Sequence, residues 1–177
     1  MRNVRNSMII AVVGGMLASS AVGVAAQSGE VDPMAPAFVT GSITDGQTAS
    51  TETRTAEEGY RRIEVVGGPD TWEASDSRLS GDVTYSGLWH RYPAPATMQV
   101  EAAARELVNS GGRWVGQATA IATATIGGWD AIVFTGEGGY EGLTAYVVID
   151  WNGDPGSFVG AIFPGDMPAF PEPVVRE

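Results

Sequence analysis

The sequence predicts an all-β domain, an antiparallel meander of short strands closed into a barrel of roughly eight strands. The first observation is alternation: from Leu143 to Trp151 every second residue is apolar, the period of a strand with one buried face. The second is glycine, which supplies 24 of the 177 residues, about twice the usual share. The third is a pair of Gly-Gly steps, at 111–112 and 127–128, each lying between two strand-like runs. A β-sandwich of the same strands is the alternative.

The N-terminal segment has the layout of a secretory signal peptide in residues 1–26. Arg2 and Arg5 precede an apolar run of small residues, and the run ends in a small-residue cleavage site at Ala26. We therefore expect a signal-peptide helix that is removed and a secreted, extracellular protein. An uncleaved N-terminal membrane anchor is the alternative, because the apolar run approaches the length of a bilayer span. The polar, proline-bearing residues 27–36 are expected to form a flexible leader.

The barrel is expected to span residues 37–165, beginning with a strand at 37–44. Residues 44–59 contain no apolar residue larger than alanine, so they cannot bury anything. They are expected to form a long polar surface loop. Three further strands are predicted after this loop, at residues 60–66, 70–75 and 82–91.

Residues 98–107, MQVEAAAREL, pose a conflict between helix and strand. Their composition favours a helix on propensity alone. The glycine turn around 110–112 instead predicts a hairpin in which the second half of this segment pairs with 113–123. A second hairpin is predicted with its turn centred on Gly127-Gly128, which would pair Thr123 with Ile132.

The last strands are predicted at 143–151 and 157–163. The connection between them, from Asp150 to Asp154, imitates the start of a calcium-binding loop. Its sixth position is Pro155 rather than glycine and its twelfth is Ala161 rather than glutamate, so a hairpin turn explains it better and a weak surface calcium site is the alternative. Residues 166–177 are expected to be a proline-rich C-terminal tail that cannot continue a strand ladder.

Several motifs in residues 75–165 carry a resemblance. They are Gly-Leu-Trp, then Arg-Trp-Val-Gly-Gln-Ala-Thr after a glycine turn, then Phe-Thr-Gly-Glu-Gly-Gly-Tyr-Glu-Gly-Leu-Thr. In this order the chain resembles uncharacterised secreted bacterial β-barrel proteins, which are distantly similar to the allene oxide cyclase and dirigent barrel superfamily. The resemblance implies a barrel, and its motifs are structural. None of the cyclase's catalytic positions matches a residue here, and the stretch before Ser75 departs from the pattern.

Composition excludes several functions. The formal net charge is −11 and there is no lysine, so the surface repels phosphate backbones and anionic lipid heads. We therefore expect neither a nucleic-acid partner nor, once the signal is cleaved, a membrane partner. There is no cysteine, which excludes disulfides, thiolate metal sites and a cysteine nucleophile. No metal site and no cofactor is predicted.

The loop FTGEGGYEGL holds the candidate residues Glu137, Tyr140 and Glu141. A phosphate-binding loop needs a helix after it, and a strand follows here. The two glutamates could bind a cation or act as acid and base if their separation were suitable. The simpler interpretation is a glycine-rich barrel corner with solvated glutamates.

The remaining candidates are aromatic residues and a lone histidine. His90 is the one side chain with an ordinary pKa near neutrality, although no Gly-x-Ser-x-Gly motif accompanies it. Together with Trp89 and Trp114 it belongs to the ligand-binding set that the sequence favours, because aromatic rings with a polar edge suit small apolar or aromatic molecules. Core filling by the same rings is the alternative.

These observations favour a non-catalytic protein that binds a small apolar or aromatic ligand, or a protein partner, and no catalytic residue is assigned. A barrel that steers a reactive small molecule, with His90, Glu137 or Glu141 polarising it, is the alternative that the resemblance implies. A structural component of the cell envelope is a third. Neither face of the strand at 113–123 is charged beyond Arg113, which predicts either cover on both sides or association into a homo-oligomer.

Overall fold

The structure is a computed structural model that describes residues 32–46, 48–55, 59–95, 97–123, 125 and 127–169. Of residues 48–55 it describes only the backbone. The predicted signal peptide, the first part of the leader and the end of the C-terminal tail lie outside the described residues. Among the residues described, no helix is long and apolar enough to cross a membrane.

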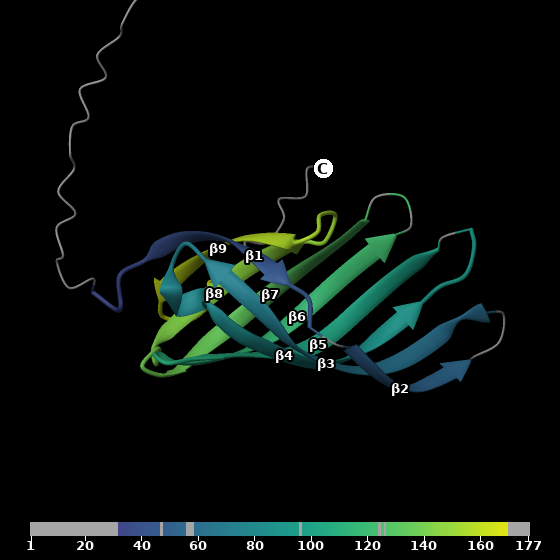
Figure 1. The fold of residues 1–177 in the computed structure, drawn as a ribbon, viewed down its shortest axis with the longest axis horizontal. Helices are drawn as coiled ribbons and strands as arrows, with labels where there is room; N and C mark the ends of the chain where they lie inside the picture. Colours follow the sequence, from purple (N-terminus) through teal and green to yellow (C-terminus); the bar gives the residue numbers. More distant parts are fainter. Residues whose placement is uncertain are drawn as a thin grey trace, which may run out of the picture. The chain divides into compact units, whose positions relative to one another are not determined.

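The described residues confirm the predicted all-β fold. They form nine strands whose neighbours all pair antiparallel, in the order β1-β9-β8-β7-β6-β5-β4-β3-β2. Their bounds are β1 (Ala37–Thr44), β2 (Thr48–Thr55), β3 (Arg61–Ala74), β4 (Gly81–Arg91), β5 (Met98–Asn109), β6 (Gly112–Thr123), β7 (Gly127–Gly138), β8 (Leu143–Asp150) and β9 (Gly156–Pro164) (Figure 1).

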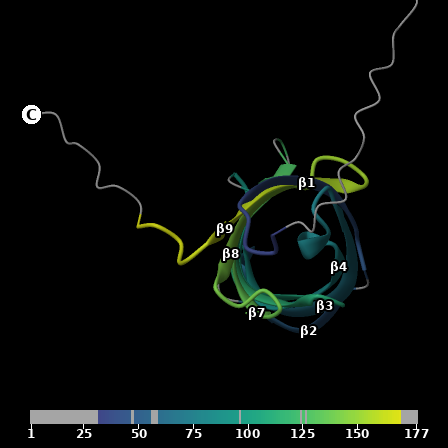
Figure 2. The ribbon, with the colours of Figure 1, turned by 90° about the vertical axis from the view of Figure 1, so that its left-hand side faces the viewer.

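Eight of these strands close into a ring, as the barrel prediction requires. β1 pairs with β9 along seven residues and with β3 on its other side, so β1 and β3–β9 form a continuous circuit (Figure 2). The ring is not an even cylinder, because β1 pairs only with residues 71–74 of β3. The first half of β3 pairs instead with β2. Closure of the ring excludes the sandwich alternative.

Strand β2 corrects the prediction of a polar loop at 44–59. Residues 48–55 pair with residues 61–67 of β3, with one register shift between Ser50 and Glu52. A strand ladder is built by backbone groups, and threonine, which occurs at four of the eight β2 positions, favours the extended backbone. The absence of large apolar side chains therefore did not preclude a strand.

Strand β3 merges two segments that the sequence predicts as separate strands. The register with β4 shifts between Gly67 and Asp70, which marks a bulge, and Gly68 lies there at φ +100°. The bulge changes which residues face inward. Ile63 and Val65 are buried before it, and Asp70 and Trp72 are buried after it.

The segment at 98–107 is strand throughout, so the hairpin outweighs the helix propensity. β5 pairs with β6 from Met98 to Asn109, which confirms the predicted hairpin, and Asn109 faces Gly112 across the turn. The predicted register of the next hairpin is wrong. Thr123 pairs with Gly127 rather than with Ile132, because the turn lies before Gly127 and the Gly-Gly pair belongs to β7.

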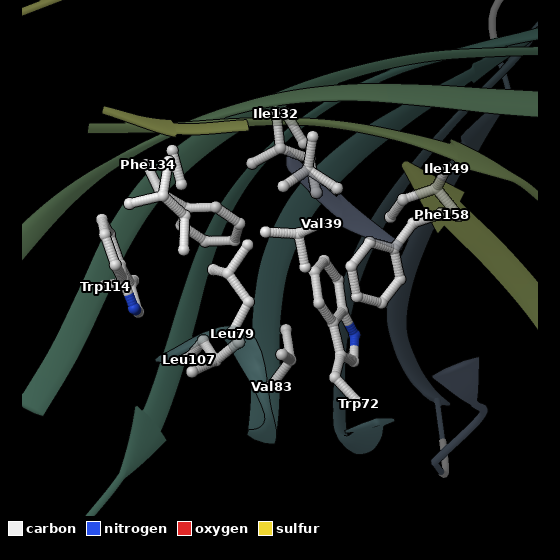
Figure 3. Packing of buried hydrophobic residues seen from close by; sticks show 14 of the residues in the cluster. Val39, Trp72, Leu79, Val83, Leu107, Trp114, Ile132, Phe134, Ile149 and Phe158 are labelled. Atoms are coloured by element: carbon white, nitrogen blue, oxygen red, sulfur yellow. The ribbon is translucent and has the colours of Figure 1, made fainter. Parts of the chain in front are cut away.

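One end of the ring is filled by a hydrophobic core. Trp72, Trp114, Phe134 and Phe158 extend into it, and Trp72 and Phe158 lie with ring centroids 4.8 Å apart (Figure 3). The short 3-10 helix η2 (Ser77–Leu79) closes this end and is seen inside the ring in Figure 2. It inserts the fully buried Leu79 among the rings.

Hydrogen bonds hold η2 to the wall of the barrel. The Trp114 indole N–H donates to the Arg78 carbonyl at 2.8 Å, and the Asn109 side-chain amide donates to the Ser80 carbonyl at 2.8 Å. The Arg78 guanidinium in turn donates to the Pro33 carbonyl at 2.7 Å. This end of the ring therefore has no room for a ligand, and any binding site inside the barrel must lie at the other end.

Candidate functional site

A cavity of about 510 Å³ occupies the end of the ring opposite η2. Its walls come from the last residues of β4 and β6, the first residues of β5, β7 and β9, and the connection between β8 and β9. These segments meet at the same end because successive strands run antiparallel. Small residues widen it: Ala120, Ala122, Gly128 and Gly156 are all lining positions. We call this space the mouth cavity.

Three charged residues form an ion cluster at the floor of the mouth cavity: Glu101, Arg105 and Asp130. Glu101 of β5 and Asp130 of β7 both pair with Ala120, the residue on the strand between them. The alanine side chain leaves room between the two carboxyl groups. Arg105 lies four residues after Glu101 and on the same face of β5. Its Nη2 is 3.5 Å from Glu101 Oε1 and forms a closer ion pair with Asp130.

The Arg105 guanidinium is held on three sides but retains one free donor. Besides the two carboxyl groups, it lies over the Tyr85 ring, with its central carbon 5.0 Å from the centroid. The side chain is only 4% exposed. Its Nε–H is buried and meets no acceptor among the described residues. A buried donor of this kind is uncommon in folded proteins and is satisfied in most cases by an ordered water, an ion or a ligand.

A third buried carboxyl group, that of Asp70, joins the lining through the β3 bulge. Its Oδ1 accepts the backbone N–H of Gly46 at 2.8 Å, which fixes the chain between β1 and β2 against β3. Burial raises the pKa of Asp70, and the nearby Arg105 charge offsets this only in part. The pKa values of Glu101 and Asp130 are also raised by burial, against the opposing effect of Arg105.

Aromatic rings form much of the remaining wall. Tyr85 and Trp89 extend inward from β4, and Trp151 follows β8. Trp129 borders the cavity, but it pairs with the exposed Ile121 and precedes the inward Asp130, so its ring lies on the outer face of β7. The Trp151 backbone N–H donates to the Gly128 carbonyl at 3.0 Å, so its backbone continues the β7–β8 ladder past the end of β8. Asp45 and Asp154 complete the rim with two more carboxyl groups. The mouth cavity thus combines aromatic surface with an excess of acid.

The six residues predicted as a ligand-binding set do not come together. Trp89 lines the mouth cavity, whereas His90, the next residue, lies on the opposite face of β4 with its Nδ1 hydrogen-bonded to the Tyr60 hydroxyl. Trp114 and Tyr140 are buried at the filled end, where their rings stack at 5.0 Å.

Glu137 lies near the end of β7 and Glu141 in the connection that follows it, at the same end as Tyr140. Both are exposed, and Glu137 is paired with Arg113. The connection is a glycine corner: Gly138 and Gly142 take positive φ angles of 65° and 84°. A side chain at Gly136 would stand 2.1 Å from the Tyr140 carbonyl oxygen, so close packing requires glycine there. This stretch is a turn, as the simpler interpretation predicts.

The residues of the ion cluster were not singled out from the sequence. A signal for them exists in the alternation itself. In VEAAAREL, Glu101 and Arg105 fall on the same strand face as Ala103 and Leu107, and in β7 Asp130 shares a face with Ile132. Charged residues at inward positions of a strand mark a buried polar site. Within the described residues, no group of three or more histidine or carboxylate side chains is arranged to hold a metal ion.

Comparisons of the chain with protein-family models, with curated proteins and with solved structures gave no match.

Proposed function

We propose that the chain is a secreted, non-catalytic protein that binds a small ligand with an apolar or aromatic portion in the mouth cavity. One observation carries this proposal: the barrel is filled at one end and hollow at the other, and the hollow end is lined by Tyr85, Trp89 and Trp151. Ligand pockets of proteins are concave, largely preformed and lined by aromatic side chains with a few convergent polar groups.

The size of the mouth cavity supports a small organic molecule. A volume of about 510 Å³ lies within the range of ordinary small-molecule sites, roughly 300–1,000 Å³. The wall is made of strands that pair on both sides, so the cavity exists without any rearrangement of the chain. A preformed cavity loses little free energy on ordering when a ligand enters.

Tryptophan fluorescence tests the proposal directly, because two of the five tryptophans, Trp89 and Trp151, extend into the mouth cavity. A panel of small aromatic and aliphatic compounds is titrated into the protein, and at least one class is expected to change the emission with saturable dependence. The variant Ala120→Phe fills the floor of the cavity and is expected to abolish that response. Ala102→Phe adds the same ring on the exposed face of the neighbouring strand and serves as its control.

A second candidate function is the guidance of a reactive small molecule, in the manner of the allene oxide cyclase and dirigent barrels that the sequence resembles. The observation that favours it is the set of carboxyl groups with raised pKa values in the cavity, because a protonated carboxyl can donate to a substrate. The roles would fall to Glu101 and Asp130. If an activity is found, Asp130→Asn is expected to reduce kcat, whereas His90→Ala, outside the cavity, is expected to leave it unchanged.

We also propose that two copies of the chain associate through the outer face of β6–β9 and β1. Between the strand ends this face carries no acidic or basic side chain, and Phe38, Ile121 and Val159 on it are exposed, Phe38 by 94%. Because each copy carries a charge of −11, an uncharged face is where copies approach with least repulsion. Light scattering after size exclusion is expected to give a dimer mass at micromolar concentration, and Val159→Glu a monomer mass.

A further inference from the structure

We infer that the ligand of the mouth cavity is a small organic cation that also carries a hydrogen-bond-accepting oxygen. The inference rests on the proposed binding function and names the chemical class that the cavity selects. Three features carry it: the charge balance of the lining, its aromatic faces, and the free donor of Arg105.

The charge balance favours a cation. The lining contains five carboxyl groups and one guanidinium. That guanidinium is already engaged by Glu101 and Asp130, which leaves Asp70, Asp45 and Asp154 without a cation of their own inside the cavity. An anionic ligand would be repelled, and an uncharged apolar ligand would displace water from carboxylates without giving them a partner. A positively charged ligand compensates the excess of negative charge in the lining.

The aromatic faces favour an organic cation over a bare metal ion. Indole rings attract ammonium groups more strongly than other side-chain rings do. The cavity has two of them, from Trp89 and Trp151, and the Tyr85 face is already occupied by the Arg105 guanidinium. No group of three or more histidine or carboxylate side chains within the described residues is placed to hold a metal. Carboxylates beside indole rings are the two components that recognise ammonium compounds.

The unpaired Nε–H of Arg105 is the reason to expect an acceptor oxygen on the ligand. This Nε–H is buried at the floor of the cavity and meets no acceptor in the part of the chain that the structure describes. A cation alone would leave this donor unpaired, at a cost of about 1–3 kcal/mol. An oxygen of the ligand that reaches the floor, while its charged end lies among the carboxyl groups and indole rings above, satisfies both requirements.

Matched pairs of probes test the charge requirement on the full chain. Choline is compared by tryptophan fluorescence and calorimetry with its uncharged carbon isostere, in which carbon replaces the quaternary nitrogen. Tyramine is compared with para-ethylphenol. We expect at least one cation to bind, and to bind on the order of tenfold or more tightly than its uncharged partner, a difference of about 1.4 kcal/mol or more. Equal affinities within both pairs, or binding of the uncharged partners alone, would overturn the inference and leave the proposed binding function standing.

A variant of the same strand provides the matched control. Glu101→Gln removes one charge at the cavity floor and keeps the shape of the side chain, so it is expected to weaken cation binding about tenfold and to leave the uncharged partner unaffected. Glu106→Gln removes the same charge on the outer face of β5, where Glu106 pairs with Arg113, and is expected to change neither. Equal effects of the two variants would contradict the inference. If neither cations nor any other class of compound binds, the inference and the proposed function fail together.

Discussion

At the scale of single residues, Arg105 determines whether the barrel can hold its buried acids. Replacing it by methionine preserves bulk but leaves Glu101 and Asp130 facing each other without a cation. We expect Arg105→Met to lower the free energy of unfolding by about 3 kcal/mol or more near neutral pH, because breaking a buried ion pair leaves an uncompensated charge. Urea unfolding of the variant and the wild type at two pH values measures this loss of stability. The deficit is expected to shrink in mild acid, where both carboxyl groups take up protons.

Arg113 is the control for that change. It also pairs with two carboxyl groups, those of Glu106 and Glu137, but at the surface and nearly half exposed. Solvent screens such pairs, so Arg113→Met is expected to have a much smaller effect with no marked dependence on pH. If the two variants lost equal stability, burial of the ion cluster would not be the source of the Arg105 effect.

At the scale of elements, the sequence predicts those parts whose side chains report on burial. Alternation locates β8 at Leu143 and the strand β1 at Ala37–Thr44 with its observed bounds. It fails for β2, whose pairing is made by backbone groups and leaves no apolar pattern to detect. Alternation also fails to predict the mouth cavity. The sequence shows charged residues on strand faces that are otherwise apolar, but only closure of the ring and the β3 bulge bring Asp70 to the same space as Glu101 and Asp130.

The helix η2 gives one prediction at this scale. Its three residues act as a plug, because Leu79 is fully buried among the rings of the filled end (Figure 3). Leu79→Ala is expected to lower the free energy of unfolding by about 3 kcal/mol, since it removes apolar contacts and leaves a cavity. Val108→Ala, on the exposed face of β5, trims a side chain at a site with little burial and is expected to cost far less. Chemical unfolding of both variants provides the comparison.

The β3 bulge gives a second prediction at the scale of elements. Gly68 lies at φ +100°, and a Cβ there would stand 2.4 Å from the Val83 carbonyl oxygen. Gly68→Ala therefore combines backbone strain with a steric clash, and we expect it to cost clearly more than the strain alone. Gly165→Ala isolates the strain, because Gly165 has φ +86° and open space around its Cα; its cost is expected to be about 1–2 kcal/mol. Melting temperatures in the reverse order would show that the bulge tolerates a side chain.

At the scale of the whole molecule, stability is expected to fall as pH rises from mildly acidic to neutral. Burial raises the pKa values of Asp70, Glu101 and Asp130 in the folded state. Above the ordinary carboxyl pKa, 3.8 for aspartate, the folded chain therefore binds more protons than the unfolded one, and the free energy of unfolding decreases as pH rises through the raised values. The net charge of −11 acts in the same direction, since deprotonation increases self-repulsion.

Asp76 sets the acid limit of that trend. The Arg78 side chain donates to its carboxylate and lowers its pKa, so its contribution is present above the ordinary pKa and is lost as pH falls through the lowered value. The opposing trends place maximum stability in mild acid. Urea midpoints measured between about pH 5 and about pH 8 are expected to decline, and Asp130→Asn is expected to flatten the decline by removing one of the groups responsible. A midpoint that rises steadily to neutral pH would mean that the carboxyl groups of the mouth cavity are solvated rather than buried.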